Sequence, residues 1–201
     1  QPSLETREAK CVRIWWESNY NVFQYQGSLQ NTVAFNLSLF NAFHTIYINE
    51  TIKVVLHHLE VWTAVSPYPN PSDPLVDDRD EYLIAFQTFR SGSFTGDLAG
   101  LVTQNNIGGV AAGFSGICNI DRNESMCISG LSGGGVGTYP NYVFNVFVTS
   151  HEFGHIFGSR HTHACVWNGN NTAIDGCSGP SSIYPEQPSI AVLLPFHTQA
   201  W

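Results

Sequence analysis

Residues 151–161 read HEFGHIFGSRH, with three histidines, one glutamate and one glycine at fixed spacings. His151 and His155 are four residues apart, so on a helix both imidazoles project from one face and can bind one metal ion. Glu152 can lie beside that metal without ligating it, within reach of a water on the metal. Gly158 tolerates the left-handed conformation that ends a helix, and the following turn delivers His161. The run therefore predicts a helix that ends at a metal ion.

Three imidazole nitrogens leave the fourth position of a tetrahedral zinc ion open to water, which separates a catalytic zinc site from a closed structural site. The alternative is an ordinary helix with two partly exposed histidines, and the pair His151 and His155 alone does not exclude it. A glycine and a third histidine at fixed offsets make coincidence a poor explanation. The sequence therefore favours a catalytic zinc site with His151, His155 and His161 as ligands and Glu152 as the catalytic residue.

The run matches the extended signature H-E-x-x-H-x-x-G-x-x-H, and the chain therefore resembles the metzincin metallopeptidases. The segments 161–169 (HTHACVWNG) and 173–177 (AIDGC) are similar to the reprolysin-like, adamalysin-related secreted enzymes of bacteria. The likeness covers approximately residues 11–177. It implies one catalytic zinc ion, a protein or peptide substrate, and a secreted zinc endopeptidase that hydrolyses peptide bonds through a zinc-bound water with Glu152 as general base. It does not imply an oligomeric state.

Two departures from that family weaken the assignment to a subfamily. Metzincins carry a methionine in a tight turn downstream of the third histidine, and the sole methionine of this chain is Met126, upstream of it. Thr162 stands where adamalysin-type enzymes usually have an aspartate, and Ser178–Trp201 does not read like the usual continuation of the family. Two alternatives therefore stay open. One is a zinc-binding but inactive pseudoprotease that acts as a peptide-binding module, and the other is a structural surface domain without a metal.

The pattern of apolar residues predicts a mixed α/β (α+β) fold in a single domain, residues 1–201. The expected strands are 11–25, 52–65, 97–104 and 109–118, and the expected helices are 28–48, about 77–89 and 141–158. With the family resemblance, this order implies a metzincin-like catalytic domain with a twisted mixed sheet and a long zinc-site helix. Residues 1–161 would form its upper subdomain, and residues 162–201 would form a short, irregular lower subdomain that is either truncated or atypical.

The segment GGVAAGF at 108–114 is rich in small residues and precedes the expected site helix. In metzincins this strand forms the upper rim of the cleft. We therefore expect Gly109, Val110, Ala111 and Ala112 to bind substrate, because small side chains let an extended peptide add as a further strand. The alternative is a plain edge strand that is kept glycine-rich for a bulge.

Composition excludes some partners and suggests a compartment. The net charge is −8, from 8 basic and 16 acidic side chains without a basic cluster, which argues against a nucleic-acid partner. No apolar stretch approaches the roughly 20 residues that a membrane-spanning helix needs. Low charge with 13% aromatic residues suggests an extracellular protein, so we expect secretion. Gln1 is not an initiator methionine, and we expect the chain to be part of a longer precursor.

The positions of the five cysteines suggest local disulfides. Cys118 and Cys127 bracket a short polar loop, and Cys165 and Cys177 bracket a loop rich in glycine and asparagine, so each pair suits a disulfide in an oxidising compartment. Cys11 is left over. The alternative is that these cysteines are free buried thiols. Asp175 could bind calcium, although nothing else in the sequence indicates a calcium site and a carboxylate next to glycine is usually turn chemistry.

Overall fold

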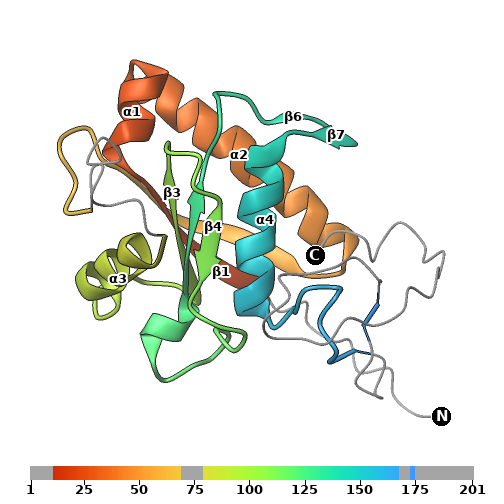
Figure 1. Cartoon of the computed structure of the whole chain (residues 1–201). Helices are drawn as coiled ribbons and strands as arrows, with labels where there is room; N and C mark the ends of the chain where they lie inside the picture. Colours follow the sequence, from red (N-terminus) through yellow and green to blue (C-terminus); the bar gives the residue numbers. More distant parts are fainter. Residues whose placement is uncertain (1–10, 69–78, 168–172, 175–201) are drawn as a thin grey trace, which may run out of the picture.

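The computed structural model describes residues 11–68, 79–167 and 173–174. Its centre is a five-stranded sheet in the order β2-β1-β3-β5-β4, flanked by helices on both faces (Figure 1). The strands are β1 (Cys11–Ser18), β2 (Lys53–Val61), β3 (Leu98–Thr103), β4 (Gly109–Ala111) and β5 (Met126–Gly130), and a separate hairpin consists of β6 (Gly137–Thr138) and β7 (Asn141–Tyr142). The helices are α1 (Tyr20–Gln26), α2 (Leu29–Asn49), α3 (Arg79–Arg90) and α4 (Phe144–Phe157), with a 3-10 turn at Arg122–Ser125.

The sheet is mixed, with one antiparallel strand at its edge. β2, β1, β3 and β5 run parallel, and β4 pairs with β5 in the opposite direction. Parallel strands are buried on both faces, and β1 fits this rule because its side chains alternate between two cores. Ile14 and Trp16 pack on the face covered by α2 and α4, whereas Trp15 packs on the face covered by α3. The mixed sheet confirms the predicted fold class.

Aromatic packing holds α4 close to the sheet. The ring of Phe153 on α4 is stacked with Trp16 at a centroid distance of 5.9 Å and lies 4.8 Å from Phe43 of α2. A Cβ atom at Gly100 of β3 would lie 2.5 Å from Cζ of Phe153, so the absence of a side chain there lets the helix approach. Burying a side chain of this size contributes about 1.5–3 kcal/mol. This packing fixes the position of α4, which carries the candidate site.

A buried carboxylate lies on the opposite face of the sheet, beneath α3. Glu17 at the end of β1 is fully buried, and it accepts hydrogen bonds from Tyr68 Oη and Trp62 Nε1, each at 2.6 Å, and from Trp15 Nε1 at 3.1 Å. Arg90 of α3 adds two more, from Nε at 2.8 Å and from Nη2 at 3.1 Å. Burial, followed by the charge of Glu17, raises the pKa of Tyr68, so its phenol stays a donor. Glu17 thus joins β1 to α3 and to the segment after β2.

The helices expected at 28–48, about 77–89 and 141–158 are confirmed as α2, α3 and α4, although α4 begins at Phe144 because Asn141–Tyr142 form β7. Several strand predictions are wrong in extent. The helix expected at 28–48 is α2, whose Ser28 side chain caps its N-terminus by accepting a hydrogen bond from the Asn31 amide at 3.2 Å. The strand expected at 11–25 ends at Ser18, because Asn19 caps a new helix. The strand expected at 109–118 ends at Ala111, and β5 is a central strand that the sequence did not predict.

Most of the predicted lower subdomain, 162–201, lies outside the described residues and stays a prediction, as does the single-domain boundary. Among the helices in the described ranges, none combines the length and the apolar character that crossing a membrane requires.

Candidate metal centre

The helix α4 brings the first two histidines together and ends where the sequence predicts. Gly158 has a φ of 110°, in the left-handed region that favours glycine. Its amide donates to the carbonyl of His155 at 2.8 Å, and the amide of Ser159 donates to the carbonyl of Gly154 at 2.9 Å. These bonds satisfy carbonyls at the helix end and reverse the chain. The reversal carries His161 back to the face of α4 that holds His151 and His155.

The three histidines point their Nε2 atoms at one place. The Nε2 atoms are 3.0 Å apart for His151 and His155, 3.0 Å for His155 and His161, and 3.1 Å for His151 and His161. Nitrogens that bind one tetrahedral zinc ion at 2.0–2.1 Å lie about 3.3 Å apart, so the observed triangle fits such an ion closely. These three residues could therefore hold a metal ion.

The surroundings of the triad favour the neutral imidazoles that bind metals. Burial, with a contribution from the other two histidines, lowers the pKa of His151 to about 4. Burial also lowers the pKa of His155, to which Arg160 contributes, and that of His161, to which His155 and His163 contribute. An imidazolium in this cluster would be both desolvated and repelled by its neighbours.

Hydrogen bonds to groups outside the triad fix two of the three histidine residues. Nδ1 of His155 donates to the carbonyl oxygen of Ser159 at 2.8 Å. Because a carbonyl can only accept, this bond places the proton on Nδ1 and leaves Nε2 free to bind a metal. The main chain of His161 accepts a hydrogen bond from Trp167 Nε1 at 2.7 Å, which fixes the loop after the helix.

Glu152 is buried beside the triad and lacks a hydrogen-bond donor among the residues that the structure describes. It is 5% exposed, and burial raises its pKa to about 8, against a lowering contribution from Arg79. Its side chain occupies the space above Gly109 of β4, where a Cβ atom would lie 2.6 Å from Oε1 and 2.7 Å from Cδ of Glu152. A carboxyl group in such a site binds a proton readily, which a general base requires.

The free edge of the sheet runs past Glu152. The Gly130 amide donates to the carbonyl of Gly108, and the Ala112 amide donates to that of Met126, so 108, 110 and 112 bond to β5 in the antiparallel ladder. The main-chain groups of Gly109 and Ala111 consequently face outward. Of the four residues predicted to bind substrate, only these two turn their main-chain groups toward the side where a strand could add. Substrate binding at Gly109, Val110, Ala111 and Ala112 stays a prediction.

Two contacts at this site do not follow from the sequence pattern. One is the packing of Gly109 against Glu152, because the sequence predicts only that this glycine lets substrate approach. The other is Arg79 at the start of α3, whose Nη1 donates to the carbonyl of Gly109 at 3.4 Å. Both join residues far apart in the chain, and no local spacing in the sequence marks such a contact.

The predicted disulfide between Cys118 and Cys127 is wrong. Both residues are free thiols, with Cys118 exposed and Cys127 fully buried. The cause is β5, because in this strand the Cys127 side chain turns into the core beneath α2 and α4, whereas Cys118 is exposed. The second predicted disulfide joins Cys165 to Cys177, which lies outside the described residues, and it stays a prediction. Asp175, the calcium candidate, also lies outside them.

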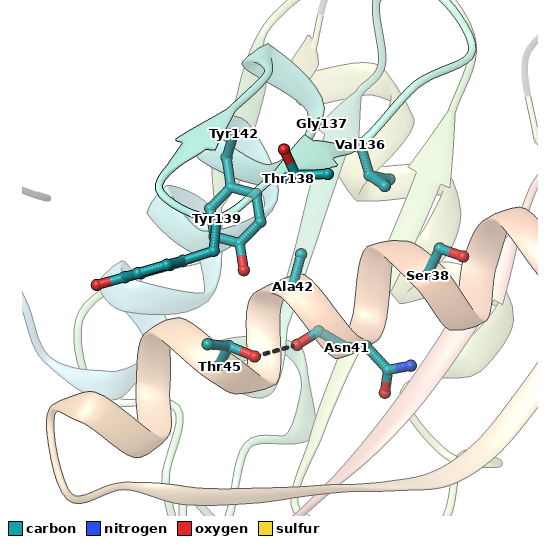
Figure 2. Close-up of a pocket in the computed structure, with 9 residues that line it drawn as sticks. All are labelled: Ser38, Asn41, Ala42, Thr45, Val136, Gly137, Thr138, Tyr139 and Tyr142. Atoms are coloured by element: carbon teal, nitrogen blue, oxygen red, sulfur yellow. Dashed lines mark hydrogen bonds between the residues drawn. The ribbon is translucent and has the colours of Figure 1, made fainter.

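Two other features lie away from the triad. Met126 is fully buried in the core under α3, on the face of the sheet opposite α4. A hollow of about 400 Å³ lies between α2 and the β6–β7 hairpin (Figure 2), and Tyr139 and Tyr142 extend over the small side chains of the helix there. Among the described residues, its lining contains no histidine, cysteine or carboxylate, so these residues offer none of the usual zinc ligands.

Comparison with known proteins agrees with this geometry. The family model Reprolysin_5, described as Metallo-peptidase family M12, matches residues 10–190. A search among curated proteins finds no match.

Proposed function

The chain belongs to metallo-peptidase family M12, and from this premise we propose that it is a secreted zinc-dependent endopeptidase that cleaves peptide bonds in proteins. The observation that carries the proposal is the convergence of three Nε2 atoms at 3.0–3.1 Å beside the buried carboxyl group of Glu152. Three neutral nitrogens suit zinc, and the neighbouring carboxylate suits proton transfer.

His151, His155 and His161 would hold the zinc ion. When bound, zinc supplies a Lewis acid that polarises the scissile carbonyl and lowers the pKa of a water toward ~7. Glu152 takes a proton from the water whose oxygen attacks the carbonyl carbon. As the carbon–nitrogen bond breaks, Glu152 gives this proton to the leaving amine. The carboxylate is restored, and no covalent intermediate with the protein forms.

The main-chain groups of Gly109 and Ala111 would hold the substrate as an added strand. Hydrogen bonds from a strand edge supply affinity for an extended peptide without regard to its side chains. The burial of Glu152 under this edge would bring the base close to the peptide main chain. Because Gly109 has no side chain, the edge and the base can come together.

A quenched fluorescent peptide library tests the proposal, with zinc content measured on the same sample. Wild-type protein should bind one zinc per chain and cleave peptides, and a chelator should stop the cleavage. Glu152→Gln should retain zinc and lose turnover by at least about a hundredfold, whereas His155→Ala should lose both. Turnover that persists in Glu152→Gln would rule out this residue as the base.

A second candidate function is a zinc-binding pseudoprotease that binds peptides. It is favoured by the absence of any methionine downstream of His161, where metzincins have one. Peptide binding with one zinc per chain, without cleavage of any library member, would favour this alternative. Secretion is proposed from the family resemblance. An immunoblot that compares the amount of the protein in culture medium and in cells tests it.

A further inference from the structure

Arg79 differs from the other arginines that the structure describes. Arg13 forms a salt bridge with Asp97, and Arg90 forms one with Glu17. Arg122 donates to the carbonyls of Gly96 and Asp97, and the guanidinium of Arg160 lies over the ring of Phe114, 3.6 Å from its centroid. Arg79 is exposed and forms no ion pair with any residue in the described ranges, although the chain carries 16 acidic residues against 8 basic ones. A cation without an ion pair in so acidic a chain is available to bind an anion.

The guanidinium of Arg79 lies at the free edge of β4. Its Nη1 is 3.4 Å from the carbonyl oxygen of Gly109, which the strand register turns outward. Gly109 in turn packs against Glu152, so Arg79 and Glu152 both contact the same residue of β4. A peptide that adds to β4 would therefore pass Arg79 close to the residue that acts as base.

The contact of Arg79 with Gly109 can be exchanged for a better one. A distance of 3.4 Å is long for a hydrogen bond, and the acceptor is an uncharged carbonyl. A carboxylate can accept two parallel hydrogen bonds from one guanidinium, and such charge-assisted pairs are about twice as strong. A carboxylate on the substrate would consequently displace the Gly109 carbonyl as the partner of Arg79.

Because of the surrounding charges, Arg79 attracts a substrate carboxylate only in direct contact. Asp80 and Glu81 follow Arg79 in the first turn of α3, so the region has no extended positive field. A generally acidic peptide would gain nothing from long-range attraction. The geometry predicts a preference for one carboxylate at one position of the peptide.

Resting on the proposed peptidase function, we propose that Arg79 is a specificity-determining residue that binds one carboxylate of the substrate peptide beside the scissile bond. The carboxylate is either an aspartate or glutamate side chain or the C-terminal carboxylate of a short peptide.

Paired peptide pools test this proposal. Each pool carries one Glu or one Gln at a scanned position, and a second set ends in a free carboxylate or an amide. The readouts are kcat/KM for cleavage and the Kd of the same dye-labelled pools from fluorescence anisotropy. Wild-type protein should prefer Glu over Gln at one position, or acid over amide at the chain end, by about ten- to hundredfold.

The variants identify the residue responsible for the preference. Arg79→Gln should reduce the preference ratio to near one, and Arg79→Lys should retain part of it, because lysine keeps the charge without the bidentate geometry. Lys53→Gln is the matched control, because it removes a positive charge from an exposed residue on β2, at the opposite edge of the sheet. This control should keep the wild-type ratio.

The proposal is overturned if wild-type protein shows the same kcat/KM and the same Kd for both members of every peptide pair. It is also overturned if Arg79→Gln keeps the wild-type preference ratio. If the protein binds the peptide pools but cleaves none of them, the proposed peptidase function is wrong, and the role of Arg79 is still tested by binding. The Kd ratios then decide on Arg79 by the same criteria.

Discussion

Two glutamates are buried on opposite faces of the sheet, and their surroundings differ completely. Glu17 under α3 is fully buried and accepts five hydrogen bonds from four side chains, one of them the cation Arg90. Glu152 on α4 is 5% exposed and accepts no hydrogen bond from any residue that the structure describes. Burying a carboxylate is costly unless it is paired.

The comparison separates a structural carboxylate from the proposed catalytic one. The partners of Glu17 stabilise its charged form and donate hydrogen bonds to both of its oxygens. This residue therefore has a structural role and joins β1 to α3. Glu152 lacks such partners, and burial raises its pKa to about 8. A carboxylate with a raised pKa binds a proton readily, and this property suits a general base. We expect substitutions to affect stability at Glu17 and activity at Glu152.

The largest effect on stability is expected from Glu17→Gln. The change leaves Arg90 without its carboxylate and disturbs three further donors, so the free energy of unfolding should fall by about 3–5 kcal/mol. Urea denaturation measures this change. Glu60→Gln is the control, since Glu60 pairs with His58 at a half-exposed site and should contribute less than about 1 kcal/mol. Equal effects of the two substitutions would contradict the comparison.

Gly109→Ala should lower the activity that depends on Glu152. The new methyl group would overlap the Glu152 side chain, so the carboxylate must move and kcat should fall about ten- to hundredfold with zinc content unchanged. Peptide cleavage and metal analysis check this on one sample. Gly92→Ala is the matched control, because no atom lies within 4 Å of a Cβ there. Unchanged kcat in Gly109→Ala would show that the position of Glu152 is not critical.

Glu152→Gln should stabilise the metal-free protein, in contrast to Glu17→Gln. An amide removes a buried ionisable group without breaking a hydrogen bond from the described residues, so unfolding should cost roughly 1–2 kcal/mol more. Thermal unfolding in the presence of chelator measures the difference. A lower Tm than wild type would mean that Glu152 has a structural partner after all.

The smallest effect is expected at the exposed pair of Asp97 and Arg13, joined at 3.0 Å. Hydrogen bonding to Arg13 lowers the pKa of Asp97, so the stability from this pair is present above the unfolded pKa of about 4 and is lost as the pH falls through the lower folded value. Asp97→Asn should therefore lower Tm slightly at pH 7, and the difference should shrink toward pH 3. A difference independent of pH would assign the effect to something other than this charge.

Local patterns predicted the parts of the fold that depend on neighbouring residues. The helix α2 follows from the spacing of its apolar residues and from the Ser28 cap. β5 was not predicted because it has only five residues and follows a polar loop. It is a strand because it pairs with β3 and β4. The wrong disulfide has the same origin, since Cys127 belongs to this strand. Spacing along the chain could not show which way its thiol points.

The sequence by itself determined that the three histidines come together. His151, His155, Gly158 and His161 lie within one helix and one turn, whose geometry is fixed by hydrogen bonds between near neighbours. Only the tertiary structure decided the surroundings of Glu152, because Gly109 packs against it from the sheet edge and Arg79 of α3 contacts Gly109 from another part of the chain. Helix and turn geometry is local, whereas burial and charge at a site depend on which distant segments the fold packs there.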